Sequence, residues 1–458
     1  MNRRDALKTM GAGFGTLGWM NLLHAESQAS NPLAPKAPHF PAKAKRVIFL
    51  FLNGGMSHVD TFDPKPMLTK HDGEPLPGPK IVTDRASGNL MRSPFEFRKY
   101  GQSGTEVSEI FPRVASKIDD FCVIRSMYSD NGNHGPSLLM MNAGHGLTGR
   151  PSMGSWVTYG LGTENQNLPG FVVLCPGYPV LGAQLWDSTF LPSVYGGTYI
   201  PSGEREPDKL VQNIHNPTYT AENQEQQLSL LDKLNRSYVQ QVGPQPGLEA
   251  GIQAMEVAYR MQTEAPGVFD IGKESQATRD RYGDHDFGRG CLTALRLAEK
   301  GVRMVQVYFG NFQPWDSHDD IRIHAKLANA ADGPIAALVE DLKSRGMFDD
   351  TLLIVGSEFG RTPMIQNSGL EKVGNGRDHN VHGFCTLLAG GGIRGGTTYG
   401  ATDDFGFKAV EKRCHVHDLH ATALHLLGMD HKRLTYRYSG RDFRLTDVAG
   451  NVIKEILA

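Results

Sequence analysis

The sequence predicts an α/β fold in which a mostly parallel central sheet carries helices on both faces. The first observation is a set of continuous apolar runs, at Val47–Leu52, Leu352–Val355 and Phe384–Ala389, which are typical of strands buried on both sides. The second is the apolar spacing of three and four residues from Leu327 to Leu342, which predicts a helix before the run at Leu352. Because this helix joins Val302–Phe309 to Leu352–Val355 over short connections, we expect parallel strands.

The same patterns place the remaining elements of one α/β domain over residues 46–458. We expect further strands at Phe121–Arg125 and Gly170–Leu174, and helices at Val107–Lys117, Cys291–Lys300 and Val416–Leu427. Between about residues 175 and 289 the pattern weakens into loops and polar helices, at Glu222–Gln241 and Gly247–Thr263. This stretch is predicted to be an insertion that either covers a site and sets substrate choice or is inert packing.

Overall charge gives no reason to expect a nucleic-acid or anionic-membrane partner. The 458 residues include 47 basic and 49 acidic side chains, for a formal net charge of -2. A chain so close to neutral has no global field that would attract a polyanion, so recognition must be local. The five cysteines are odd in number and widely spaced, which favours buried thiols over a disulfide framework.

The N-terminus has the pattern of a twin-arginine export signal. Arg3 and Arg4 precede a moderately apolar stretch from Met10 to Leu23, and small residues follow up to Ala29. The apolar stretch is shorter than the roughly 20 residues of a membrane span. We therefore predict a signal peptide at 1–29, a Pro/Ala/Lys-rich linker at 30–45, no membrane segment in the mature chain, and a periplasmic or extracellular location.

Polar clusters follow the predicted strands, at the edge where open α/β sheets bind ligands. Carboxylates and neutral imidazoles are the ligands of zinc, manganese or calcium. Each cluster alone is more typical of solvated polar surface, but their shared position after core strands predicts a divalent-metal or anion site. The clusters are Asn53, His58 and Asp60; Asp316, His318 and Asp320; Glu358 and Arg361; and Asp378, His379 and His382.

Two more features favour anion chemistry at the same edge. The planar guanidinium of Arg361 suits a sulfate, phosphate or carboxylate. The loop Asn131–Ser137 opens a helix predicted to begin at about Leu138, and a helix N-terminus attracts anions.

Several motifs resemble a known superfamily. DDTLLIVGSEFGRTP (349–363) resembles the strand and following segment of alkaline phosphatases, sulfatases and cofactor-independent phosphoglycerate mutases, and HVHDLHATALHLLGMD (415–430) resembles their late helix. More narrowly, GGMSHVDTFDPKP, WDSHDD, GSEFGRTP, GRDH and AGGGIRGG are together similar to domain-of-unknown-function family 1501, an uncharacterised, mostly twin-arginine-exported and sulfatase-like family of that superfamily. The resemblance spans nearly the whole mature chain and implies an alkaline-phosphatase-like three-layer sandwich.

The resemblance also implies roles for individual residues. The superfamily's first-strand aspartate falls on Asn53, and its aspartate–histidine pair after the central strand falls on Glu358 and Phe359. The nucleophile position falls on His134, with Ser137 nearby. Asp316 and His379 match second-metal ligands, with His318, Asp320 and His382 as alternates.

Two functional hypotheses follow from these residues. In the first, the chain is an exported metal-dependent hydrolase of sulfate or phosphate esters, on small molecules or polysaccharides. Asp316, Glu358 and His379 bind the metal, Arg361 holds the anion, and His134 or Ser137 acts as nucleophile or general acid/base. In the second, the chain is a non-catalytic binding or structural protein that retains the fold. The sequence makes no prediction of oligomeric state.

Overall fold

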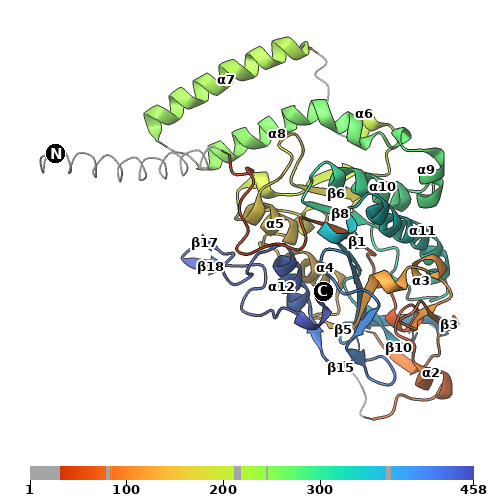
Figure 1. Cartoon of the computed structure of the whole chain (residues 1–458). Coiled ribbons are helices and arrows are strands. Elements are labelled where there is room, and N and C mark those ends of the chain that lie inside the picture. The colour runs from red at the N-terminus through yellow and green to blue at the C-terminus, as the bar shows by residue number, and fades with distance from the viewer. Residues whose placement is uncertain (1–30, 79–82, 84, 211–217, 244–245, 368–372) are drawn as a thin grey trace, which may run out of the picture.

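The structure is a computed structural model that describes residues 31–78, 83, 85–210, 218–243, 246–367 and 373–458. The predicted signal peptide at 1–29 lies outside these residues. Figure 1 shows the described chain as one α/β body, with one helix, α7 (Ala221–Val242), standing apart from it.

A nine-stranded sheet forms the centre of the described part of the chain. Its order is β13-β5-β12-β9-β1-β8-β6-β7, with β16 paired to β5. Every pairing is parallel except those of β12, which runs antiparallel to both β5 and β9. The strands are β1 (Arg46–Phe51), β5 (Phe121–Tyr128), β6 (Phe171–Cys175), β7 (Thr198–Pro201), β8 (Met304–Tyr308), β9 (Thr351–Gly356), β12 (Phe384–Ala389), β13 (Thr397–Tyr399) and β16 (Cys414–His415).

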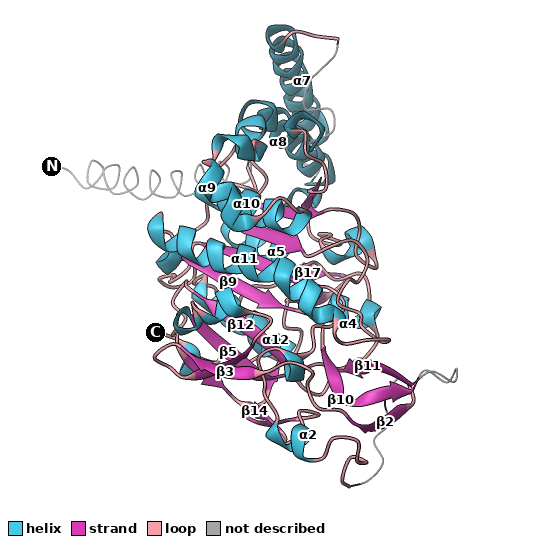
Figure 2. Ribbon diagram, turned by 90° about the vertical axis from the view of Figure 1, so that its right-hand side faces the viewer, coloured by secondary structure: helices cyan, strands magenta, loops and turns pink. Residues whose placement is uncertain are grey.

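Helices cover both faces of this sheet, which confirms the predicted α/β sandwich. Figures 1 and 2 show α10 (Asp286–Glu299) and α11 (Ile323–Ser344) on one face and α4 (His134–Ala143), α5 (Met153–Leu161) and α12 (Val416–Leu426) on the other. The central strands are buried along their length, as continuous apolar runs predict.

The predicted unit of two parallel strands joined by a helix is confirmed, and a third strand lies between the two. β8 and β9 flank α11 in the chain and run parallel, but β1 lies between them in the sheet. Register aligns the last residues of the three strands, since Phe51 pairs with both Tyr308 and Gly356. The loops that follow these strands therefore start at the same level of one sheet edge.

Two predicted elements differ in the structure. The helix expected at Val107–Lys117 is instead strand β4 (Thr105–Ser108), paired with β3 (Phe97–Tyr100), followed by the short helix α3 (Pro112–Ala115). The loop expected near His379 is strand β11 (Val373–Asn380), which joins β10 (Gly360–Asn367) and β2 (Ser87–Leu90) in a second sheet. In both cases cross-strand pairing overrides local sequence preference.

The segment predicted to be a linker packs against the body. Leu33 is buried, Lys36 N donates to Leu161 O at 2.9 Å, and Lys43 N and Ala44 N donate to Leu426 O at 2.8 and 2.9 Å. These bonds fix the segment across the ends of α5 and α12, so it does not behave as a free spacer.

The predicted insertion adds strand β7 to the sheet edge and a set of helices. Figures 1 and 2 place α7 and α8 at the end of the molecule opposite β10, so these helices do not cover β10. Among the described helices, none is long and apolar enough to cross a membrane. The helices of this region are α6 (Pro207–Leu210), α7 (Ala221–Val242), α8 (Pro246–Phe269) and α9 (Gln276–Tyr282). Elsewhere in the described chain, the remaining small elements are α2 (Pro66–Lys70), β14 (Ala401–Thr402), β15 (Ala409–Glu411), β17 (Tyr436–Tyr438) and β18 (Arg441–Phe443).

Candidate metal centre

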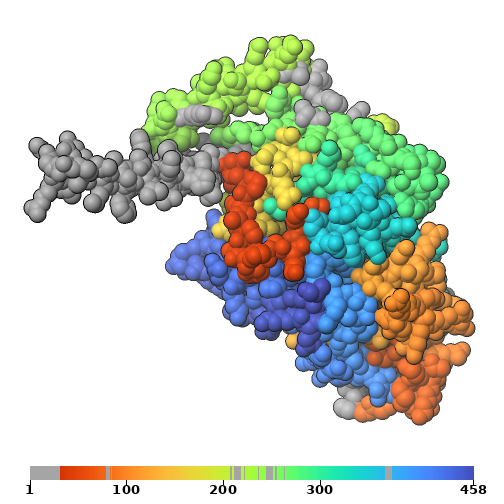
Figure 3. Space-filling view, viewed as in Figure 1, coloured from red at the N-terminus to blue at the C-terminus, as the bar shows by residue number. Residues whose placement is uncertain are grey.

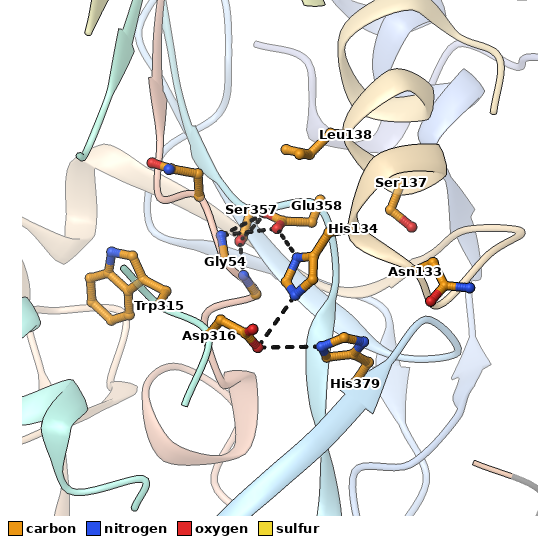
Figure 4. Close-up of polar contacts among 12 residues, drawn as sticks. Gly54, Asn133, His134, Ser137, Leu138, Trp315, Asp316, Ser357, Glu358 and His379 are labelled. Atoms are coloured by element: carbon orange, nitrogen blue, oxygen red, sulfur yellow. Dashed lines mark hydrogen bonds and ion pairs between the residues drawn. The ribbon is translucent and has the colours of Figure 1, made fainter. Parts of the chain in front are cut away.

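Four side chains from three separate segments converge beyond the carboxyl ends of β1, β8 and β9. One potential ligand atom from each of His134, Asp316, His318 and His379 lies within 4.8 Å of all the others. His134 begins α4, Asp316 and His318 follow β8, and His379 lies on β11. We call these four residues the histidine cluster. Figure 4 shows His134, Asp316 and His379 pointing toward one another from their separate elements.

The three imidazoles of the histidine cluster all direct Nε2 at one carboxylate oxygen. The distances to Asp316 Oδ1 are 3.3 Å from His134, 2.8 Å from His318 and 3.3 Å from His379. The Nε2 atoms of His318 and His379 are themselves 3.0 Å apart. Three imidazole nitrogens therefore converge on one carboxylate oxygen.

A buried carboxylate sets the orientation of His134. Its Nδ1 lies 2.8 Å from Glu358 Oε1. Glu358 has no exposed surface and accepts further hydrogen bonds from Gly54 N at 2.9 and 3.1 Å, and Ser357 Oγ lies 2.9 Å from its Oε2. Because an ionised carboxylate can only accept, Nδ1 carries a proton, and Nε2 faces Asp316. Figure 4 shows this chain from Gly54 and Ser357 through Glu358 to His134.

An amide oxygen sets the orientation of His318 in the same way. Its Nδ1 contacts Gln366 Oε1 on β10, so Nδ1 donates and Nε2 faces Asp316. Carboxylate and carbonyl partners on the outer ring nitrogen are typical of metal-bound histidines, because they fix the tautomer and the ring plane.

The residues of the histidine cluster fit a divalent metal ion. Nδ1 of His134 and of His318 is held by an outer partner, which leaves Nε2 of each directed at Asp316 and able, when deprotonated, to bind a cation. Three imidazole nitrogens and one carboxylate oxygen suit zinc or manganese, whereas calcium takes six to eight oxygen ligands. Of the three metals predicted, the donor set therefore disfavours calcium.

Electrostatic interactions keep the carboxylates of Asp316 and of the neighbouring Glu358 ionised. Burial raises the pKa of Asp316, but hydrogen bonds from the three histidines and the charge of Arg361 lower it further, so the net shift is well below the ordinary value. Burial likewise raises the pKa of Glu358, and the contact with His134 reverses that effect. For His134, burial lowers the pKa and the two carboxylates raise it by more. Burial lowers the pKa of His379, which keeps that imidazole neutral.

The contacts of Arg361 differ from those of the anion-binding role predicted for it. Its guanidinium is fully buried, with Nε donating to Gly55 O at 2.9 Å and Nη1 to Arg377 O at 3.2 Å. Nη2 contacts Gly54 O and donates to Asp316 Oδ1 at 2.6 Å. With these donors committed, the geometry corrects the predicted anion-binding role: Arg361 holds the loop after β1 against Asp316.

Asn53 lies outside the histidine cluster although it follows β1. Its Nδ2 donates to Gly310 O at 3.0 Å and to Phe312 O at 2.5 Å, and its Oδ1 accepts from Gly310 N at 3.3 Å. The amide is therefore used to tie the loop after β1 to the loop after β8, and the metal role predicted for it is not supported by this geometry.

His58 and Asp60 also have partners elsewhere. His58 Nε2 lies 2.7 Å from Gly406 O, and Asp60 forms a buried ion pair with Arg377 at 2.7 Å. Neither side chain has its ligand atom in the histidine cluster, so the structure corrects both predicted ligand roles to structural ones.

The other predicted residues are similarly placed apart. His382 packs its ring against Phe407 at 5.3 Å, and Asp320 pairs with Arg322 at 2.7 Å near the surface. Ser137 lies on α4 with its hydroxyl donating to Asn131 O, and Figure 4 shows it on the far side of the helix turn from Asp316. The structure therefore brings Asp316, His318, His379 and His134 together, with Glu358 behind them, and leaves out His382, Asp320 and Ser137.

Gln366 and Ser357 complete the site and were not predicted as functional residues. Gln366 fixes His318, and Ser357 Oγ donates to Leu52 O at 2.6 Å while contacting Glu358. The only sequence signal for Gln366 is its strand position downstream of Arg361, which is too general to single it out.

Comparison with known proteins gives a family but no activity. The model of a family described as "Protein of unknown function (DUF1501)" matches residues 44–457, which is most of the chain. No curated protein matches the chain.

Solved structures match the chain at low similarity. They include the PsFucS1 sulfatase from Pseudoalteromonas sp., at 13% identity and a TM-score of 0.35 over 84% of this chain and 68% of that one. The lipoteichoic acid synthase LtaP from Listeria monocytogenes matches at 11% identity and a TM-score of 0.36, over 90% and 78% of the two chains. A phosphonate monoester hydrolase of Agrobacterium radiobacter matches at 12% and 0.36, over 84% and 74%.

Proposed function

We propose that this chain, which belongs to the DUF1501 family, is a metal-dependent hydrolase of sulfate or phosphate esters. The observation that carries the proposal is the convergence of His134, His318 and His379 on Asp316, with two of the histidine tautomers fixed from outside. Three imidazole nitrogens and a carboxylate oxygen gathered in this way are the ligand types that a divalent metal ion takes.

Each residue has a definite task in this proposal. His134, His318, His379 and Asp316 hold a zinc or manganese ion, which when bound lowers the pKa of a coordinated water and polarises an ester oxygen. Glu358 keeps the proton of His134 on Nδ1. Asp316 is the most exposed member of the cluster, at 23% of its side chain, so we place the approach of the ester on its side.

The proposal includes export and a glycan or small-molecule substrate. Export is supported by the Arg3–Arg4 pair and the apolar stretch that follows it. A polysaccharide ester is supported by that export signal and by the sulfatase-like motifs, since an exported hydrolase meets extracellular polymers.

A second candidate, a non-catalytic binding protein, is favoured by one observation. The superfamily's nucleophile position is occupied by His134, whose ring is bonded to Glu358 and directed at Asp316. A hydroxyl nucleophile is absent from that position, so hydrolysis would have to use water.

Metal content tests the proposal most directly. Protein folded with zinc or manganese supplied is expected to contain one equivalent by elemental analysis, and Asp316→Ala and His379→Ala are expected to lose it. Ser137→Ala is the matched control, because this residue lies outside the cluster and should retain the metal. Wild-type protein without bound metal after either treatment would contradict the proposal.

Turnover separates the two candidates. The metal-loaded protein is expected to hydrolyse at least one member of a panel of aryl sulfates and aryl phosphates, and His379→Ala to hydrolyse none. A metal-loaded protein that binds sulfated oligosaccharides and releases no sulfate or phosphate would favour the binding protein instead.

A further inference from the structure

The loops that follow β6 and β8 expose aromatic side chains at the sheet edge that carries the histidine cluster. β6 lies next to β8 and runs parallel to it, and Leu174 pairs with Val307, so both loops begin at the same level of that edge. Tyr178, in the loop after β6, is 52% exposed, and Phe312, in the loop after β8, is 68% exposed. Ligands of open α/β sheets bind beyond this edge, so the two rings lie where a substrate would pass.

The two loops are fixed to each other and to the core. Phe312 N donates to Tyr178 O at 3.0 Å, and Tyr178 N donates to Asn311 Oδ1 at 2.9 Å. The ring of Tyr178 stacks on that of Tyr199 at 4.7 Å, and Tyr199 stacks on the buried Trp186 at 5.7 Å. The ring of Tyr178 is therefore the outer member of an aromatic stack that begins in the core, and it is positioned before a ligand arrives.

These loops border the histidine cluster on two sides. Leu181 Cδ1 lies 3.7 Å from the point that a Cβ on Gly135 would occupy, and Gly135 directly follows His134. Phe312 precedes Asp316 by four residues in the loop after β8. We call Tyr178, Leu181 and Phe312 the apolar rim. It adjoins the cluster on the side of Asp316, where we place the approach of the ester.

Two members of the apolar rim have an unfavourable backbone conformation. Leu181 has a φ of 71° and Phe312 a φ of 59°, in the left-handed region that residues other than glycine and asparagine rarely adopt. Phe312 is held there by its bond to Tyr178 and by Asn53 Nδ2, which donates to Phe312 O at 2.5 Å. Backbone strain of this kind concentrates at ligand sites, because the surrounding structure maintains it there for function.

The two loops contain no charged residue. Residues 176–186 and 309–315 include no Asp, Glu, Lys, Arg or His. An ester group finds its partners in the histidine cluster, but the loops offer no partner to a second charge on the same molecule. An uncharged ring suits this surface, because its flat apolar face can stack on an aromatic side chain.

We propose that the apolar rim selects the substrate: a sulfate or phosphate monoester whose organic group is an uncharged ring that stacks on Tyr178 and Phe312. This inference rests on the proposed function, because the histidine cluster holds the ester group. An aromatic ring and a neutral sugar ring share this chemistry, whereas an organic group that carries further sulfate or carboxylate groups does not fit. Tyr178 and Phe312 are specificity residues, since they contact the organic group and not the ester bond.

Kinetics with matched esters test the apolar rim. Ethyl and benzyl esters, and glucose esterified at its primary hydroxyl, all release primary alkoxides, so their kcat/KM values compare organic groups at similar intrinsic reactivity. We expect the better of the two ring esters to exceed the ethyl ester by at least about tenfold with metal-loaded wild type, as sulfate or as phosphate. Which ring ester is better identifies the kind of ring. A para-carboxylate on the benzyl ester is expected to remove the gain.

A double variant tests the two aromatic residues. Tyr178→Ala/Phe312→Asn is expected to lose the preference for ring esters while it retains bound metal and hydrolysis of the ethyl ester. Asparagine adopts the left-handed backbone readily, so the loop after β8 should keep its conformation. Tyr238→Ala is the matched control, because this tyrosine is 51% exposed and lies on α7, which Figures 1 and 3 show standing apart from the body.

Binding gives a second readout that needs no turnover. Benzylphosphonate and ethylphosphonate have no ester bond to hydrolyse, and calorimetry with the metal-loaded protein is expected to give a dissociation constant about tenfold lower for benzylphosphonate. Equal values for ring and ethyl compounds in the wild type, or a double variant that keeps the wild-type preference, would overturn the role of the apolar rim alone. Wild-type protein that neither holds metal nor hydrolyses any ester would overturn the proposed function as well.

Discussion

Two buried polar clusters arise from the same strand-end loops, and their hydrogen bonding differs. The first is the histidine cluster. The second, which we call the arginine cluster, consists of Asp60, Arg377, Ser57 and His324. In it, Arg377 donates to Asp60 at 2.7 and 3.2 Å, and Ser57 Oγ donates to the same carboxylate. Ser57 N donates to His324 Nε2 at 3.1 Å.

Every contact in the arginine cluster joins a donor to an acceptor. Asp60 and Arg377 have no exposed surface, and although burial raises the pKa of Asp60, its contacts with Arg377, Ser57 and His324 together lower it by more. The histidine cluster instead gathers three imidazole nitrogens around one carboxylate oxygen and retains partial exposure there. The arginine cluster stabilises the fold, whereas the donor set of the histidine cluster suits a metal ion.

The largest expected difference between the clusters is in stability. Asp60→Ala leaves the charge of Arg377 buried and unpaired, so we expect the free energy of unfolding to fall by about 3–5 kcal/mol in urea denaturation. Asp320→Ala, which breaks the exposed pair with Arg322, should cost less than about 1 kcal/mol. If Asp60→Ala instead removed bound metal from folded protein, the separation of the two clusters would be wrong.

A smaller effect is expected from the residue behind His134. Glu358→Gln retains an acceptor but removes the charge that fixes the His134 tautomer, so metal affinity should fall by about 10–100-fold. Competition with a chelator measures this affinity. Glu411→Gln, at an exposed position on β15, is the control. An unchanged affinity in Glu358→Gln would show that His134 does not bind the metal.

The smallest effect is a pH dependence that comes from the arginine cluster. Burial lowers the pKa of His324 from 6.5 to about 3, so folded protein keeps it neutral while unfolded chain protonates it below about pH 6.5. The unfolded state then binds more protons, and the free energy of unfolding falls with decreasing pH, by about 1.4 kcal/mol at pH 5.5 from this group. His324→Gln should flatten the urea-derived pH profile.

Much of the fold was predictable because it depends on burial. The runs at Val47–Leu52, Leu352–Val355 and Phe384–Ala389 correspond to β1, β9 and β12 to within a residue or two. β11 was not predictable, because Gly374–Asn380 is polar and its strand depends on pairing with β10. The antiparallel direction of β12 has no local signal either.

The candidate site was predictable in part. Asp316, His318 and His379 were expected as ligands and lie together, and the resemblance drew attention to His134. Asp60 was expected with them, but a sequence does not reveal that Arg377, more than three hundred residues later, already neutralises it.

The sequence by itself determined the layers of the fold and the loops that reach one edge of the sheet, because apolar periodicity reports which surfaces must leave water. Only the tertiary structure decided which polar side chains of those loops satisfy one another and which face a common point. That distinction depends on the positions of donors and acceptors to within a few tenths of an ångström, and these are fixed when β1, β8, β9 and β11 come together.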